Sequence, residues 1–321
     1  MKDFGSLTKL GKARRYRWAL VRALEEYPIE AKSLNPVSFD SRPVYRVCTH
    51  ERCYAAKFYN PSQHLLAQLL GEVQFLDHIS GNGDSNIETP FPNRFGGFVT
   101  EIKGPWLPEP AYIVLYGWLP GRQLRNHIYT RSYRHLGRCS AWVHKASSDF
   151  TPDWEFDILT NDRVFYWDKE TILSGPGSKS LRRESRALFS EGTDMAQEAI
   201  DKVWNSGEPI VIHNDLHPSN VKVHRGVLYL YDFEDICWGF PQQDIGTAMY
   251  HIRFEANYRE LLSAFRTGYE RLLAWPFDSE EQLDRFVIAR LLMFANYVVN
   301  YNIRPAYHLP RFEKKLRSLL N

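Results

Sequence analysis

The sequence predicts an α+β protein in two parts, a smaller N-terminal part rich in strands and a larger C-terminal part built mainly of helices. The chain has 321 residues, 44% of them hydrophobic and 14% aromatic, which is enough for a substantial core in two lobes. Strand-like runs cluster before residue 120, and helical apolar spacing dominates after it. We therefore place an N-terminal lobe at 1–116, a hinge at 117–121 and a C-terminal lobe at 122–321.

The N-terminal part is expected to begin with a helix and a hairpin. Residues 12–27 have helical apolar spacing and end near Pro28. The runs 44–49 and 53–59 flank a short polar turn, which predicts a β-hairpin. A second helix, at about 64–79, carries Glu72.

The rest of the chain changes character after one more strand. An apolar strand at 112–118 runs into a turn of Leu, Pro and Gly, where we place the hinge. Beyond it, helical spacing recurs at 133–146, 194–204 and 259–273. The segment 174–180 is small and polar, which is typical of a loop.

Composition excludes several classes of protein. Lys and Arg number 40 against 38 for Asp and Glu, so the net charge of +2 indicates neither a nucleic-acid partner nor an anionic membrane. The longest apolar runs are interrupted by polar residues and are too short to span a bilayer. The four cysteines show no CxxC pair, and no secretory leader precedes them, so we expect reduced thiols in a cytoplasmic protein.

Residues 213–235 hold the most informative motif. Asp215 is followed five residues later by Asn220, and a short hydrophobic strand at 227–231 leads to Asp232 and Phe233. Kinase catalytic loops have this order, in which the first Asp accepts the proton of the substrate while the Asn and the second Asp hold magnesium. An Asp and Asn pair alone is common in turns, but chance rarely supplies all these parts in order. The motif therefore predicts phosphoryl transfer from a nucleotide to an alcohol.

The same residues resemble the aminoglycoside phosphotransferase and choline kinase family, whose catalytic loop is His-x-Asp-x-x-x-x-Asn. His213, Asp215 and Asn220 match this pattern, and Asp244 resembles the aspartate that braces the loop. Glu234 stands where protein kinases carry Gly. The resemblance implies a bilobal protein kinase-like fold with ATP and Mg²⁺ as cofactors, and it is strongest to the branch of homoserine kinase-like proteins and stress response kinase A.

The resemblance also implies a phosphate site in the N-terminal lobe. The strand around Lys57 is similar to the Val-Ala-Ile-Lys strand of kinases, so Lys57 is the candidate to pair with the α- and β-phosphates. Glu72 would hold that lysine in place, unless it lies on a solvated helix face. The phosphate-covering loop has no Gly-x-Gly-x-x-Gly, so its cradle would use backbone amides and the hydroxyls of Ser38 and Ser41.

The adenine edge is expected at the hinge. Backbone groups of Leu115, Tyr116 and Trp118 would bind it, with the path of the backbone mattering more than residue identity. The plainer alternative for this segment is an ordinary edge strand followed by a turn.

In the implied mechanism, the three polar residues of the motif have separate roles. Asp215 would orient and deprotonate the acceptor hydroxyl, and Asn220 and Asp232 would hold Mg²⁺. The charge near the acceptor is mixed, because carboxylates after the first C-terminal helix are offset by arginines of the later helices: Asp153, Glu155, Asp157 and Asp162 against Arg253, Arg290 and Arg304. The expected acceptor is a hydroxyl of a small molecule such as an aminoglycoside or amino alcohol.

Two alternatives belong to other functional classes. A Ser/Thr protein kinase of the stress response kinase A type would need an extended groove, yet no Ala-Pro-Glu segment follows Asp232 and little room is left for an activation loop. A catalytically silent nucleotide-binding scaffold would be expected to lack at least one of Lys57, Asp215, Asn220 and Asp232, and all four are present.

Overall fold

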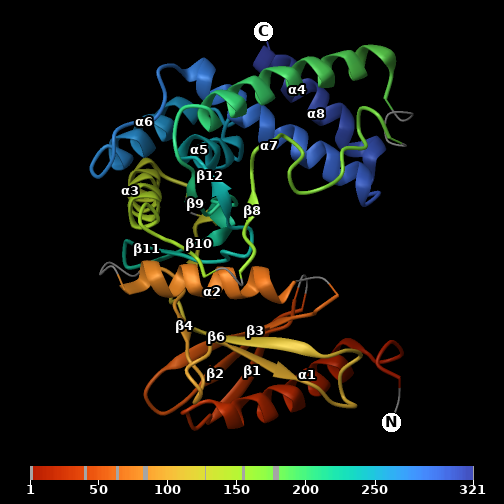
Figure 1. Ribbon diagram of the computed structural model, residues 1–321, viewed down its shortest axis with the longest axis vertical. Helices are drawn as coiled ribbons and strands as arrows, with labels where there is room; N and C mark the ends of the chain where they lie inside the picture. The colour runs from red at the N-terminus through yellow and green to blue at the C-terminus, as the bar shows by residue number, and fades with distance from the viewer. Residues whose placement is uncertain are drawn as a thin grey trace. The chain divides into compact units, whose positions relative to one another are not determined.

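The computed structural model describes residues 3–39, 42–62, 65–81, 86–126, 128–153, 156–175 and 181–320. Its internal contacts form two compact units (Figure 1). The first comprises Met1–Pro120 with Thr151–Asp157, and the second comprises Gly121–Phe150 with Ile158–Asn321. Strands dominate the first unit and helices the second, which confirms the predicted α+β class. The boundaries of the lobes and of the hinge stay a prediction.

The first unit is built on an antiparallel sheet with the strand order β1-β2-β3-β6-β4, in which β5 also pairs with β6. Its strands are β1 (Ser33–Ser38), β2 (Val44–Cys48), β3 (Cys53–Tyr59), β4 (Pro90–Phe91), β5 (Val99–Ile102) and β6 (Ala111–Gly117). The hairpin expected at 44–59 is present as β2 and β3. Because β6 pairs with β3 on one side and with β4 and β5 on the other, the edge-strand alternative for this segment is wrong.

The two faces of this sheet differ in chemistry. Helix α1 (Lys9–Ala23), continued by a turn at Leu24–Glu26, packs its buried side on an apolar core that includes Ala56 and Phe58 of β3. Side chains alternate along a strand, so Lys57 and Tyr59 point to the opposite face. That face is covered by α2 (Leu66–Gly81), and the two helices lie on opposite sides of the sheet in Figure 1.

The hairpin also corrects an expectation about cysteines. Cys48 and Cys53 are opposite each other in the register of β2 and β3, with Cα atoms 4.0 Å apart, and they form a disulfide. The expectation of four reduced thiols is therefore wrong for this pair. Cys139 and Cys237 are not in a disulfide.

The second unit is mainly helical. Its helices are α3 (Thr130–Ala146), α4 (Arg183–Trp204), α5 (Pro241–Tyr250), α6 (Tyr258–Tyr269), α7 (Glu280–Asn300) and α8 (Pro305–Leu320). The backbones of α3 and α6 approach closely, because a Cβ atom on Gly137 would lie 2.0 Å from the carbonyl oxygen of Phe265. Helix α7 packs against α4, α5 and α8. None of the described helices is long and apolar enough to cross a lipid bilayer.

Two small sheets hold the motif residues of this unit. The first has the order β11-β10-β7 and the second the order β8-β12-β9. Their strands are β7 (Arg122–Gln123), β8 (Leu159–Thr160), β9 (Ile210–Ile212), β10 (Val221–His224), β11 (Val227–Leu230) and β12 (Cys237–Gly239). The chain from 213 to 220 therefore connects β9 to β10, and residues 231–236 connect β11 to β12.

Candidate active site

A series of buried hydrogen bonds holds the loop that follows β9. The backbone N–H of Asn214 donates to Oδ1 of Asp244 at 2.7 Å, and Asp244 Oδ2 lies 2.9 Å from Nε2 of His144. The other ring nitrogen of His144 lies 2.9 Å from the hydroxyl of Tyr269. Burial alone would raise the pKa of Asp244, but the hydrogen bond with His144 and further donors lower it, so the carboxylate is ionised. The bracing contact that the resemblance implied for Asp244 is confirmed.

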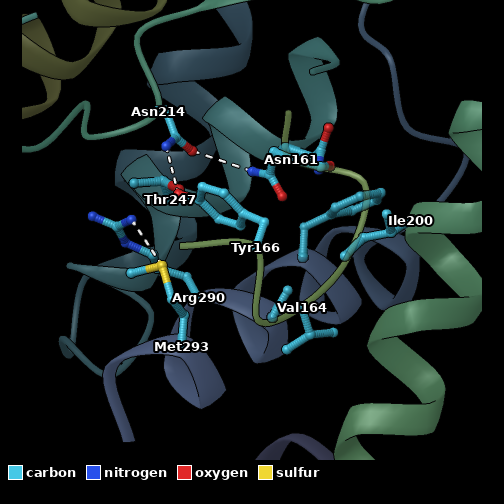
Figure 2. Close-up of a pocket in the computed structure, with 11 residues that line it drawn as sticks. Asn161, Val164, Tyr166, Ile200, Asn214, Thr247, Arg290 and Met293 are labelled. Carbon is cyan, nitrogen blue, oxygen red and sulfur yellow. Dashed lines mark hydrogen bonds between the residues drawn. The ribbon is translucent and has the colours of Figure 1, made fainter. Parts of the chain in front are cut away.

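The side chain of Asn214 is also held. It donates to the hydroxyl of Tyr166 at 2.5 Å and accepts from Asn161 at 3.2 Å (Figure 2). A cavity of about 20 Å³ beside these residues has room for a single water and is too small for an acceptor. Asn214 adopts a positive φ of 63°, a conformation for which Asn is better suited than most residues. The loop is therefore supported by both backbone and side-chain contacts.

Asp215 is surrounded by three hydrogen-bond donors. Asn220 Nδ2 donates to Oδ2 at 2.7 Å, His217 Nε2 lies 3.1 Å from the same oxygen, and Arg290 Nη2 of α7 donates to Oδ1. Burial would raise the pKa of Asp215, but the hydrogen bond from His217 and the charge of Arg290 outweigh it and lower this pKa to about 2. Asp215 is thus a well-oriented carboxylate and a weak base.

The rings of His217 and His251 stand beside this carboxylate. The N–H of Ser219 donates to His217 Nδ1 at 3.1 Å, which leaves the proton of the neutral ring on Nε2, facing Asp215. The His251 ring lies 4.6 Å from that of His217, and burial, His217 and Arg290 lower the pKa of His251 to about 3. Ligand atoms of Asp215, His217 and His251 lie within 4.8 Å of one another. A metal ion bound to His217 Nε2 would displace the proton on that nitrogen. The proton would then sit on Nδ1 and break the hydrogen bond from the N–H of Ser219, so this cluster suits hydrogen bonding better than metal binding.

Asn220 and Asp232 are brought together by the β10–β11 hairpin. Val221 pairs with Leu230, and the N–H of Tyr231 donates to the carbonyl of Asn220 at 3.1 Å, so Asp232 follows at the same end of the hairpin. The amide nitrogen of Asn220 is committed to Asp215, which turns its Oδ1 away from that contact. Asp232 adopts a φ of 69°, uncommon for a residue other than Gly. An amide oxygen and a carboxylate are the ligand types that suit Mg²⁺.

In the first unit, Lys57 lies in a buried polar cluster. Its Nζ lies 2.8 Å from Oε2 of Glu88. Glu72 accepts hydrogen bonds from the hydroxyls of Tyr116 at 2.8 Å and Tyr59 at 3.3 Å. Burial raises the pKa of Glu72, while the charge of Lys57 acts to lower it, so the two residues belong to one cluster. The solvated alternative for Glu72 is wrong, because its exposed fraction is 3%. Glu88 was not expected, since no motif marks the loop that carries it.

The backbone at the end of β6 is engaged within the first unit. The N–H of Gly117 donates to the carbonyl of Thr89 at 2.9 Å, and that of Trp118 donates to the carbonyl of Cys53 at 3.1 Å. Leu115 and Tyr116 are fully buried. The Trp118 amide is therefore not available to adenine in this arrangement, and contact through the remaining backbone groups of this segment stays a prediction.

Of the two serines expected at the phosphate-covering loop, one lies among the described residues. Ser38 ends β1, opposite Val44 of β2. Ser41 lies outside the described residues. A role for either hydroxyl stays a prediction.

The charged residues considered near the acceptor differ in their exposure and in their ion pairs. Asp153, Asp157 and Asp162 are exposed, and Glu155 lies outside the described residues. Arg253 forms an ion pair with Asp284 at 2.7 Å, and Arg304 is exposed. Of the three arginines, Arg290 is the one in contact with Asp215. A cation within the apolar run of α7 was the signal that could have identified it.

Comparisons with known proteins place this geometry in a family. A model of the phosphotransferase enzyme family matches residues 34–280. Amicoumacin kinase of Bacillus subtilis (strain 168) is 20% identical over 239 residues, covering 70% of this chain and 68% of that protein.

Solved structures show the same fold. An amicoumacin kinase in complex with AMP-PNP, Ca²⁺ and Ami has a TM-score of 0.74 at 17% identity, covering 97% of this chain and 96% of that one. A microcompartment-associated aminopropanol kinase has a TM-score of 0.72 at 20% identity, with coverage of 92% and 93%. The expected family and kinase-like fold are confirmed, and the chain belongs to the phosphotransferase enzyme family.

Proposed function

We propose that this enzyme transfers the γ-phosphoryl group of ATP to a hydroxyl of a small molecule, with Mg²⁺ as its metal. The observation that carries the proposal is the arrangement of Asp215 and Asn220, in which one amide group orients the carboxylate and leaves its own oxygen for a metal. The relatives support the same chemistry, since their names describe kinases of amicoumacin and aminopropanol. A protein Ser or Thr as acceptor is the alternative to be tested beside it.

Asp215 would act mainly by orientation. Phosphoryl transfer passes through a loose transition state, so the acceptor hydroxyl keeps its proton until late and a strong base is not required. With its pKa lowered to about 2, Asp215 is ionised and accepts a hydrogen bond from the hydroxyl without first taking its proton. His217, Asn220 and Arg290 keep the carboxylate in one rotamer, so little reorganisation is needed when the acceptor binds.

Asn220 and Asp232 would hold Mg²⁺, which supplies charge neutralisation at the phosphates when bound. Lys57 would contribute a second positive charge toward the α- and β-phosphates. Its position is set by Glu88 at 2.8 Å, and Glu72 shares the cluster. Backbone groups at Leu115–Trp118 for adenine, and Ser38 and Ser41 for the phosphates, complete the proposed nucleotide contacts.

We also propose a cytoplasmic location, where ATP is available. The Cys48–Cys53 disulfide is the observation against it, because disulfides seldom persist in a reducing compartment. Counting free thiols in protein quenched with alkylating agent directly from cells decides the point. Four alkylated cysteines fit the cytoplasm, and two fit an oxidising compartment.

The test of function is Mg²⁺-dependent ATP consumption with a panel of amino alcohols, aminoglycosides, hydroxy acids and generic protein substrates. Asp215→Ala should abolish turnover with every acceptor while ATP still binds, as measured by calorimetry. Asp194→Ala, which changes an exposed carboxylate of α4 in the same unit, should behave as wild type. Turnover that survives in Asp215→Ala would contradict the proposal.

A further inference from the structure

Arg290 is a buried cation placed directly against the proposed catalytic carboxylate. Its side chain is 4% exposed, and its Nη2 donates to Asp215 Oδ1. The guanidinium also lies 4.6 Å from the ring of Phe294, and Nη1 makes a weak contact of 3.5 Å with the sulfur of Met293. Arg290 therefore has one strong anionic partner among the described residues, and that partner is the residue expected to meet the acceptor.

The guanidinium keeps unused hydrogen-bonding capacity. Arginine has five N–H donors, and among the described residues Nε is buried without a partner. Leaving a buried charged donor unsatisfied is costly, so a protein retains one where a ligand or water completes it. Arg290 therefore has the donors to bind two anions, the carboxylate of Asp215 and a second anionic group on the substrate.

Several groups near Asp215 in this unit bear on the charge that an acceptor would meet. His251 is neutral, because burial, His217 and Arg290 lower its pKa to about 3. Lys315 of α8 stacks 5.3 Å from the ring of Tyr250, and its charge acts on His251 together with that of Arg290. Asp244 is committed to His144 and Asn214. Arg290 thus pairs with Asp215, while Lys315 adds a second cation, on which the charge of Glu255 acts in turn.

We propose that the acceptor carries a carboxylate, or a comparable anionic group, beside the hydroxyl that is phosphorylated, and that Arg290 binds this group. A hydroxyl hydrogen-bonded to Asp215 is within a few ångströms of the guanidinium, so a carboxylate on the adjacent carbon can reach it. An ammonium group in that position would meet a like charge. This inference rests on the proposed function. It narrows the expected acceptor to an anionic compound, in contrast to the amine in the name of one similar structure, the aminopropanol kinase.

The experiment uses three acceptors with one carbon skeleton and different charge: glycerate, glycerol and 3-amino-1,2-propanediol. Initial rates with ATP and Mg²⁺ and binding by calorimetry are measured for wild type, Arg290→Lys and Arg290→Met. Wild type should favour glycerate over the amine by about 10- to 100-fold in kcat/KM, as expected for one charge-assisted hydrogen-bonded contact. Arg290→Met should remove most of this preference, mainly through KM, and Arg290→Lys should retain part of it.

Arg253→Met is the matched control, because Arg253 pairs with Asp284 and not with Asp215. It should keep the wild-type preference for glycerate. A wild-type preference for the amine or for glycerol, an unchanged preference in folded Arg290→Met, or failure of all three probes to bind would each overturn the inference. If amino alcohols are then phosphorylated in an Asp215-dependent manner, the proposed function stands while the charge assignment fails. If no acceptor is phosphorylated, both fail.

Discussion

Lys57 and Glu88 form an ion pair of 2.8 Å whose side chains are only 8% and 4% exposed. Burying two opposite charges is favourable only if each keeps its partner, because removal of one leaves the other uncompensated. The pair therefore couples the stability of the first unit to the orientation of the lysine that is proposed to contact phosphates.

Replacement of Glu88 by Gln should both destabilise the protein and weaken nucleotide binding. We expect the free energy of unfolding to fall by about 3 kcal/mol, since the variant removes the carboxylate that lies 2.8 Å from the buried Lys57 Nζ. The KM for ATP should rise in the same variant. Denaturant unfolding and steady-state kinetics measure the two effects. Glu101→Gln, which alters an exposed pair with Lys103, should change stability by less than about 1 kcal/mol.

Replacement of Asp244 by Asn should cost stability in a pH-dependent way. The folded-state pKa of Asp244 is lowered, so its charge stabilises the fold above the unfolded pKa near 3.9, and this contribution is lost as the pH falls through the folded value. The deficit of the variant in unfolding free energy should be largest near neutral pH and shrink below about pH 4. Urea unfolding at pH 7, 5 and 3.5 tests this. A deficit independent of pH would argue against ionisation of Asp244. The exposed Asp278→Asn serves as control.

His217→Asn separates orientation of Asp215 from folding of the loop. Asn can still accept from the N–H of Ser219, as His217 Nδ1 does, but it cannot place a donor where His217 Nε2 meets Asp215. We expect kcat to fall by about tenfold, the effect of one lost hydrogen bond to a charged group, with little change in the KM for ATP. Steady-state kinetics with any productive acceptor measures both values. Equal losses in His50→Asn, an exposed site in the first unit, would point to a nonspecific cause.

Removal of the disulfide by Cys48→Ser should lower stability modestly. The bridge closes a loop of only about six residues, for which the chain-entropy estimate is about 2 kcal/mol. Thermal unfolding with and without reductant tests this, because wild type should respond to reductant and Cys48→Ser should not. Cys139→Ser removes a thiol that is outside the disulfide and should keep the response.

The sequence allowed the local parts of the site to be predicted. Asp215, Asn220 and Asp232 lie within 18 residues of chain, and a hairpin between them sets their spacing. Glu88 and Arg290 could not be placed in the same way, because they reach Lys57 and Asp215 across 31 and 75 residues through packing of a loop and of α7. The disulfide was missed because it depends on the exact register of the β2–β3 hairpin, in which Cys48 lies opposite Cys53, and the pattern of apolar residues did not fix that register.

Two different helices hold the loop that carries Asp215. Asp244 of α5 anchors its backbone, whereas the cation beside Asp215 is Arg290 of α7. One turn and a half further on, Asn296 accepts from the N–H groups of Thr171 and Ile172 and so holds a different segment. If Arg290 binds the acceptor as proposed, a substitution at position 290 would change which acceptors bind, while the contacts of Asp244 and Asn296 would still hold their two loops in place.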